Sequence, residues 1–201
     1  MLLAGLTGGL ASGKSHVGHE FERLGCLLVK ADALGHEVLL PGGEAYQPAV
    51  DEFGPGILNP DGTINRRKLA AEVFDRPDRL AKLNGFVHPP VRERTRAIVA
   101  AFAREHPDGI AVVEAAILIE TGTFRNYDRL IVVTCTEEQQ VTRAMARDGI
   151  TRDEALARLR RQLPLSEKVK YADYVIDTSG SRESTAAQTR AVYEKLRSSS
   201  K

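Results

Sequence analysis

The chain has 201 residues, 42% of them hydrophobic, and its 28 Lys and Arg nearly balance 27 Asp and Glu, for a formal charge of +1. A chain of this length can bury one sizeable core, so we expect a single domain. The balanced charge argues against nucleic acid or an anionic membrane as a partner, and no apolar run approaches the roughly 20 residues that a membrane-spanning helix needs. The first apolar run starts at once without a basic leader, so we expect a cytoplasmic protein.

The predicted elements begin with a strand, a loop and a helix. Leu2–Thr7 is apolar and stops at two glycines, and residues 15–24 have a helical pattern that Gly25 ends in the C′ position. Residues 26–29 predict a second buried strand, which leads directly into a helix over about 31–40.

From residue 44 to 106 helical periods alternate with turn sequences, and no strand-like run interrupts them. Three further apolar runs predict strands, at 110–114, 130–135 and 174–177. Five short strands with helices between them predict an α/β fold of three layers, a five-stranded parallel sheet flanked by helices. The core of this one domain would span about 1–43 and 107–201, with a helical insertion at about 44–106.

Local signals refine the helices. His88-Pro89-Pro90 predicts a rigid break between two helices of the insertion, and there a histidine is more often a turn or cap residue than a ligand-binding one. Thr151-Arg152-Asp153-Glu154 has the spacing of a capping box, so a helix is predicted from there to about Gln162. We expect the Ser198–Ser200 tail to fray.

The first loop carries the strongest motif. Gly8-x4-Gly13-Lys14-Ser15 is a P-loop, and it stands in the required context, after a strand and at the start of a helix. Glycines let successive backbone N–H groups converge on phosphates, and the helix N-terminus adds its positive dipole end. Lys14 is predicted to reach the β- and γ-phosphates and Ser15 the Mg²⁺. The predicted nucleotide-binding residues of this loop are Gly9, Ala11, Ser12, Gly13, Lys14, Ser15 and His16.

Two acids follow strands that are predicted to end beside this loop. Asp32 could accept the proton of an attacking hydroxyl or orient that hydroxyl; alternatively, it caps the helix that follows. Glu114 ends its strand as a Walker-B acid does and could hold the metal through a water; alternatively, it is a charge that faces solvent.

Arginines gather in the segment 143–165. Arg143 and Arg147 share one helical face, and Arg158 lies on the next helix beyond a hinge near Gly149. Such arginines often form a solvated face paired with acids. The alternative is a lid whose guanidinium groups close over the phosphates and neutralise charge in the transition state.

Taken together, these segments resemble the dephospho-coenzyme A kinases, P-loop enzymes that phosphorylate the 3′-hydroxyl of the ribose of dephospho-coenzyme A. Leu6–Ser15 is similar to that family's LTGGIGSGKS, and the likeness spans nearly the whole chain. The other matching segments are Val29–Val38, Val73–Pro89, Ala116–Glu120, Gln140–Asp148, Ala155–Gln162 and Lys168–Asp177.

The resemblance implies that ATP and Mg²⁺ bind at the P-loop and that dephospho-coenzyme A is the acceptor. No obligate protein partner is evident from the sequence. It implies that Asp32 faces the ribose hydroxyl, that Arg147 acts with Lys14 in catalysis as part of the lid, and that the insertion binds the coenzyme. The other site residues that it implies are Arg143, Thr178 and Gly180 for the nucleotide, and His88, Glu120 and Arg158 for the substrate.

Four positions depart from the family pattern. Lys30 replaces the first acid of the family's Asp-Ala-Asp, so either that acid is dispensable or the lysine contacts an anionic group of the substrate. His16 stands where Thr is common, which the loop should tolerate because its backbone does the binding. Ala116 replaces a proline, and Thr178 replaces the Asn beside the adenine.

The main hypothesis is therefore transfer of a phosphoryl group from ATP to the 3′-hydroxyl of dephospho-coenzyme A, by positioning and charge neutralisation. Another small-molecule kinase, acting on a nucleoside or a sugar acid, is the nearest alternative. A nucleotide-dependent switch module is a third, less favoured because a helical insertion and an arginine lid suit an acceptor pocket better.

Overall fold

The computed structural model describes residues 1–199. It contains two compact units. Met1–Lys30 and the chain from Val99 onward form the first, called here the sheet unit, and Ala31–Ile98 form the second, called the helical unit.

The sheet unit is built on one parallel sheet of five strands in the order β2-β3-β1-β4-β5, which confirms the predicted fold. The strands are β1 (Leu2–Gly8), β2 (Leu27–Lys30), β3 (Ile110–Glu114), β4 (Arg129–Thr134) and β5 (Tyr174–Asp177). The register places Leu6 and Lys30 opposite Glu114, and Gly8 opposite Val133. The carboxyl ends of the strands therefore meet at one edge, where ligands of such sheets bind.

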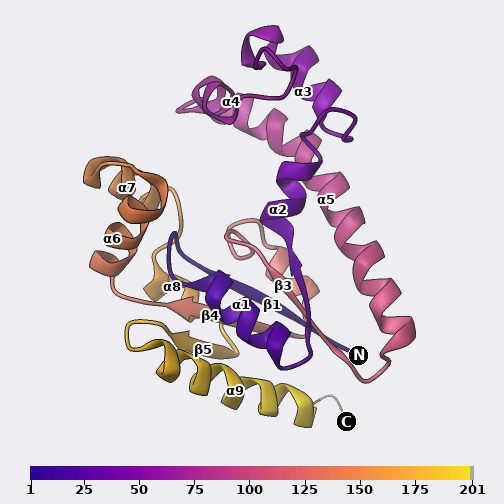
Figure 1. Cartoon of the computed structure of the whole chain (residues 1–201), viewed down its shortest axis with the longest axis vertical. Helices are drawn as coiled ribbons and strands as arrows, with labels where there is room; N and C mark the ends of the chain where they lie inside the picture. The colour runs from indigo at the N-terminus through magenta and orange to yellow at the C-terminus, as the bar shows by residue number, and fades with distance from the viewer. Residues whose placement is uncertain (200–201) are drawn as a thin grey trace. The chain divides into compact units, whose positions relative to one another are not determined.

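Helices follow the strands of this unit. They are α1 (Lys14–Arg23), α6 (Glu137–Asp148), α7 (Arg152–Leu159), α8 (Leu165–Val169) and α9 (Arg182–Ser199), with a short 3₁₀ helix η2 (Thr123–Asn126). Helices α1 and α9 pack against each other and cover one face of the sheet (Figure 1). On that face Phe21 and Leu196 are fully buried with Leu6, Ile131 and Ile176, because alternate strand residues point to the same side.

The other face of the sheet is covered in part by the segment after β3. A Cβ on Gly5 would lie 3.0 Å from side-chain atoms of both Leu118 and Tyr127, so glycine lets this segment approach the strand closely.

Cys26, between α1 and β2, is buried. This burial raises the pKa of its thiol to about 12, so the group acts as a small apolar side chain.

The helical unit has its own small core. Its elements are α2 (Ala31–Glu37), α3 (Tyr46–Phe53), the 3₁₀ helix η1 (Pro55–Ile57), α4 (Arg66–Val73) and the larger part of α5 (Pro77–Glu105). Phe53, Ile57 and Leu69 are buried together in this core. Apart from one antiparallel bridge between Leu58 and Ile64, the described unit contains no strand pairing, as the sequence predicted.

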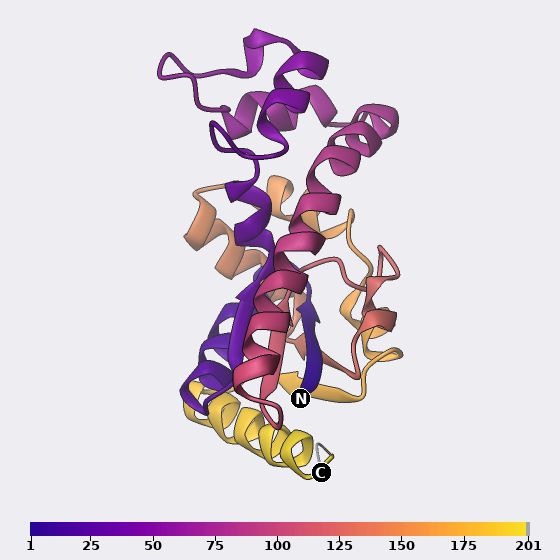
Figure 2. The same ribbon diagram turned by 90° about the vertical axis from the view of Figure 1, so that its right-hand side faces the viewer.

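The predicted break at His88-Pro89-Pro90 is wrong. Helix α5 contains both prolines, and its ribbon runs without interruption in Figure 2. The proline ring holds φ near −65°, a helical value, so what the helix loses is two backbone donors. Leu83 and Phe86, one turn earlier, pack on the core of the helical unit and hold that turn in place.

Two helix ends also differ from the prediction. Helix α7 ends at Leu159, which leaves Gln162 in the connection to α8. Ser198 and Ser199 belong to α9, where their hydroxyls donate to the carbonyl of Lys195. Ser200 lies outside the described residues.

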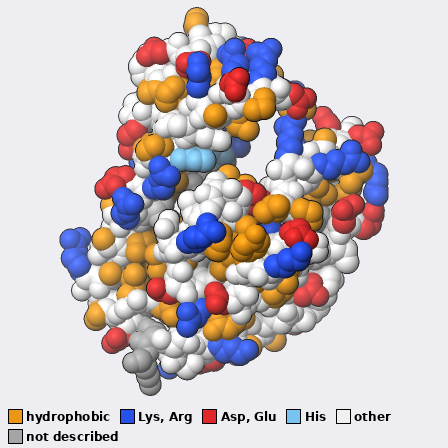
Figure 3. Space-filling view, turned by 180° about the vertical axis from the view of Figure 1, so that it is seen from behind, with side chains coloured by type: hydrophobic (Ala, Val, Ile, Leu, Met, Phe, Trp, Pro, Cys, Tyr) orange, Lys and Arg blue, Asp and Glu red, His pale blue; other side chains and the backbone are white. Residues whose placement is uncertain are grey.

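The face of the molecule shown in Figure 3 matches the balanced composition. On the face shown in Figure 3, basic and acidic side chains are interspersed, without a continuous area of one sign. Within residues 1–199, no helix combines the length and the apolar character that crossing a membrane would require.

Candidate active site

Glycines shape the loop between β1 and α1 at three positions. A Cβ on Gly8 would lie 2.6 Å from the carbonyl oxygen of Val133, and one on Gly9 would collide with the side-chain amide of Gln140. Gly13 has φ of 91°, in the left-handed region that favours glycine. The loop therefore has the close packing and the backbone conformation that a phosphate cradle needs.

Lys14 and Ser15 begin helix α1 at the carboxyl edge of the sheet. The ammonium of Lys14 donates to the carbonyls of Gly9, at 3.0 Å, and Gly8, at 3.5 Å. Ser15 Oγ donates to Glu114 Oε1 at 2.8 Å. The nucleotide-loop residues predicted from the sequence thus meet the acid of β3.

Glu114 does not face solvent, because only 6% of the residue is exposed. Its second oxygen, Oε2, is buried and has no hydrogen-bond partner among residues 1–199. A carboxylate oxygen without a partner beside a serine hydroxyl is a donor set that suits Mg²⁺. No group of three or more His, Cys, Asp or Glu side chains that could hold a metal occurs in the described chain.

Thr178 joins three parts of the site. Its hydroxyl donates to the carbonyl of Ser12 at 2.7 Å and accepts from Arg143 Nη1 at 3.0 Å. Arg143 Nη2 also donates to the Thr178 carbonyl at 2.8 Å. Helix α6, the P-loop and the loop after β5 are therefore connected through one buried threonine, a contact that the sequence did not predict for this residue.

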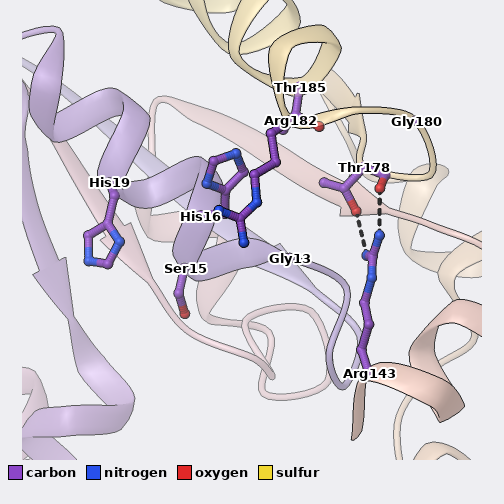
Figure 4. A pocket seen from close by; sticks show the side chains of 9 residues that line it. All are labelled: Gly13, Ser15, His16, His19, Arg143, Thr178, Gly180, Arg182 and Thr185. Carbon is purple, nitrogen blue, oxygen red and sulfur yellow. Dashed lines mark hydrogen bonds between the residues drawn. The ribbon is translucent and has the colours of Figure 1, made fainter. Parts of the chain in front are cut away.

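A pocket of about 370 Å³ opens beside α1 and the loop after β5 (Figure 4). The predicted nucleotide-binding residues that line it are Gly13, Ser15, His16, Arg143, Thr178 and Gly180. His19, Arg182 and Thr185 line it as well and carried no motif that would have singled them out. The Nε2 atom of His16 is buried and has no hydrogen-bond partner in the described part of the chain.

Asp148 gathers two of the predicted lid arginines. Arg147 donates to both of its carboxylate oxygens, at 2.8 and 3.0 Å, and Arg158 donates to one of them at 3.0 Å. The hydrogen bond from Arg147 is the main cause that lowers the pKa of Asp148. The side chains of Arg147 and Arg158 are 59% and 50% exposed, so both guanidinium groups have solvent access.

Lys168, to which the sequence analysis gave no role, is fully buried. Its ammonium lies 2.8 Å from Glu120 Oε1 and donates to the carbonyls of Ala116, at 2.8 Å, and Gly8, at 3.4 Å. Glu120 also accepts from the backbone N–H of Leu163 at 3.1 Å. This cluster ties the start of the P-loop to the segments after β3 and α7, and it occupies the carboxylate of Glu120, a predicted substrate ligand.

Two further predicted residues belong to the helical unit. Asp32 lies in the first turn of α2, which begins at Ala31, so it is not the cap of a later helix start. Its side chain is exposed and makes no hydrogen bond or ion pair among residues 1–199. His88 lies inside α5 and is neither a turn nor a cap residue, and burial is the main cause that lowers its pKa.

The fold and the site together define a class of protein. A parallel sheet of the order 2-3-1-4-5, with a lysine- and serine-bearing glycine loop after the central strand and a buried acid on the neighbouring strand, is the architecture of P-loop kinases.

Comparisons with known proteins specify the family. The family model for dephospho-CoA kinase matches residues 2–184. The dephospho-CoA kinase of Carboxydothermus hydrogenoformans is 44% identical over 193 residues, which cover 96% of this chain and 93% of that protein. Among solved structures, TT1252 from Thermus thermophilus is 33% identical with a TM-score of 0.80, and each chain is covered to 97%. A dephospho-CoA kinase from Campylobacter jejuni is 25% identical with a TM-score of 0.71, and each chain is covered to 98%. The chain belongs to the dephospho-CoA kinase family.

Proposed function

We propose that this protein transfers the γ-phosphoryl group of ATP to the 3′-hydroxyl of the ribose of dephospho-coenzyme A, which gives coenzyme A and ADP. The observation that carries the proposal is the family match across residues 2–184, a range that includes the whole P-loop. Transfer of this kind needs little covalent work by the protein, because positioning and charge neutralisation lower the barrier.

The donor side of the reaction is assigned to the P-loop. In this proposal the ammonium of Lys14 exchanges the carbonyls of Gly8 and Gly9 for oxygens of the β- and γ-phosphates. Ser15 and Glu114 supply the protein oxygens near a Mg²⁺ ion, because the buried Oε2 of Glu114 lacks a partner among the described residues. The ion would neutralise phosphate charge and orient the chain of phosphates.

The acceptor side is assigned to Asp32. Its exposed carboxylate, at the start of α2, is available to accept the proton of the ribose hydroxyl as the oxygen attacks phosphorus. We assign the helical unit, with His88, to binding of the coenzyme, and we keep Lys30 as a candidate contact for an anionic group of that substrate.

Arginines are assigned to the developing negative charge. Arg143 lines the pocket and contacts the loop after β5, and this supports its assignment to nucleotide binding. Arg147 and Arg158 keep solvent access while they share Asp148, and a substrate phosphate can compete for their guanidinium groups. In this proposal the segment 143–165 is a lid that closes on the phosphates, and not a permanently solvated face.

The acceptor is tested by a coupled assay of ADP release in the presence of Mg²⁺. Turnover should depend on dephospho-coenzyme A and should not be stimulated comparably by adenosine or gluconate. A preference for either of these would replace the assignment by another small-molecule kinase. Tight nucleotide binding without stimulation by any acceptor would indicate a switch module.

Asp32→Asn tests the role of the acid. It should lower kcat by about 10²-fold or more, the size of a general-base contribution, and leave the affinity for ADP within about twofold. Asp108→Asn, at an exposed turn of the sheet unit, is the matched control and should keep the wild-type kcat. Unchanged turnover in Asp32→Asn would remove this residue from the mechanism.

A further inference from the structure

Two glutamines hold a single residue of the P-loop by both of its backbone groups. The N–H of Leu10 donates to Gln162 Oε1 at 2.8 Å, and the carbonyl of Leu10 accepts from Gln140 Nε2 at 2.7 Å. Gln140 is on α6 and Gln162 lies in the connection between α7 and α8. The peptide groups of Leu10 are therefore oriented by side chains that come from two other segments of the chain.

Apolar packing reinforces this arrangement. The side chains of Leu10 and Ala11 pack against a buried cluster that α6 and α7 form through Val141, Ala144 and Ala155. Gln140 is itself only 5% exposed, and it fills the space beside Gly9 that a Cβ would need. Hydrogen bonds and packing thus join the P-loop to the base of the α6–α7 hairpin.

The direction of each hydrogen bond is unambiguous. A backbone N–H can only donate and a backbone carbonyl can only accept, so Gln162 must present its oxygen and Gln140 its amide nitrogen. The Leu10 N–H is thereby engaged by protein and not by phosphate. Ala11, the next residue, has φ of 51°, which is uncommon for a residue with a Cβ and has to be held by its surroundings.

We propose that Gln140 and Gln162 are positioning residues for phosphoryl transfer: they clamp the Leu10 peptide and so keep the P-loop in its phosphate-binding conformation, as one unit with the α6–α7 hairpin that carries the arginines. The inference rests on the proposed function for its substrate. It concerns the nucleotide side of the site, which can be measured without the acceptor.

The same substitution should have a large effect at one position and a small effect at the other. Gln140→Glu replaces the donor by a carboxylate that faces a carbonyl oxygen, whereas Gln162→Glu keeps an oxygen that accepts from the Leu10 N–H. We expect Gln140→Glu to weaken the binding of a fluorescent ADP analogue and to raise KM for ATP by about tenfold or more, the cost of an unsatisfied buried group. Gln162→Glu should change both by less than about threefold, because its hydrogen bond is retained. Asn126→Asp, at an exposed position at the end of η2, adds the same charge and serves as the control.

Methionine variants keep the test decisive if Gln140→Glu does not fold. Gln140→Met and Gln162→Met each remove one bond, and each should raise KM for ATP more than it lowers kcat. Both bonds orient the same residue, so their losses should not add. The double variant should therefore raise KM for ATP by no more than about twice the factor found for the more affected single variant.

Two results would overturn the clamp. One is an equal effect of the Glu substitution at the two positions, and the other is a double Met variant whose effects multiply as for independent sites. If the wild-type protein failed to use dephospho-coenzyme A, the proposed function would be wrong. The measurements of ADP-analogue binding by the Gln140 and Gln162 variants would still test the clamp.

Discussion

Lys168 offers a sharp test of how the P-loop is anchored. Substitution by methionine keeps the length and the apolar stem of the side chain but removes the buried ammonium, which contacts Glu120, Ala116 and Gly8. The carboxylate of Glu120 then loses its ion partner, and two backbone carbonyls lose a donor. We expect the folded protein to be destabilised.

The magnitude follows from the burial of the pair. Removing one partner of a buried ion pair costs about 3–5 kcal/mol in the free energy of unfolding. The side chain of Glu120 is 20% exposed, and it still accepts a hydrogen bond from the N–H of Leu163 in the variant. We therefore expect a loss at the lower end of this range, about 3 kcal/mol. For a chain of this size that corresponds to a fall in Tm of about 6 to 12 °C.

Urea unfolding followed by circular dichroism measures the change, and an unchanged m-value shows that stability alone has shifted. Lys170→Met is the matched control two residues away, since its pair with Glu167 is exposed at both ends and contributes at most about 1 kcal/mol. If Lys168→Met lost no more stability than Lys170→Met, the reasoning about the buried cluster would be refuted.

Two further predictions concern other parts of the chain. Gly9→Ala should weaken binding of the ADP analogue by about tenfold or more, because the added methyl group would displace the amide of Gln140 and leave the Leu10 carbonyl without its donor; calorimetric binding at the wild-type affinity would contradict this. Burial lowers the pKa of His88, so the folded state binds fewer protons than the unfolded state. Its contribution to the free energy of unfolding should therefore be fully present above the ordinary value of about 6.5 and decline as pH falls through that value toward the folded pKa. Urea unfolding at several pH values should show a shallower decline for His88→Gln, and identical slopes would contradict the assignment.

Local patterns were sufficient for much of the fold. Residues adjacent in the chain specify the strand positions, the P-loop and the capping box at Thr151. These features can therefore be predicted from the sequence alone. Helix α5 shows the limit of such reasoning. Pro89 and Pro90 look like a break when read alone, whereas a long helix whose preceding turn packs on the core of the helical unit tolerates two missing donors.

The sequence by itself determined the phosphate loop, the positions of the strands along the chain and the acid at the end of β3, because a short run of residues specifies each. Only the tertiary structure decided what holds the loop in place. Lys168, Gln140 and Gln162 reach it from more than a hundred positions away in the chain. A buried lysine and two amide side chains carry no periodicity or motif of their own. Their hydrogen-bond partners are distant in the chain and can be identified only from the folded structure.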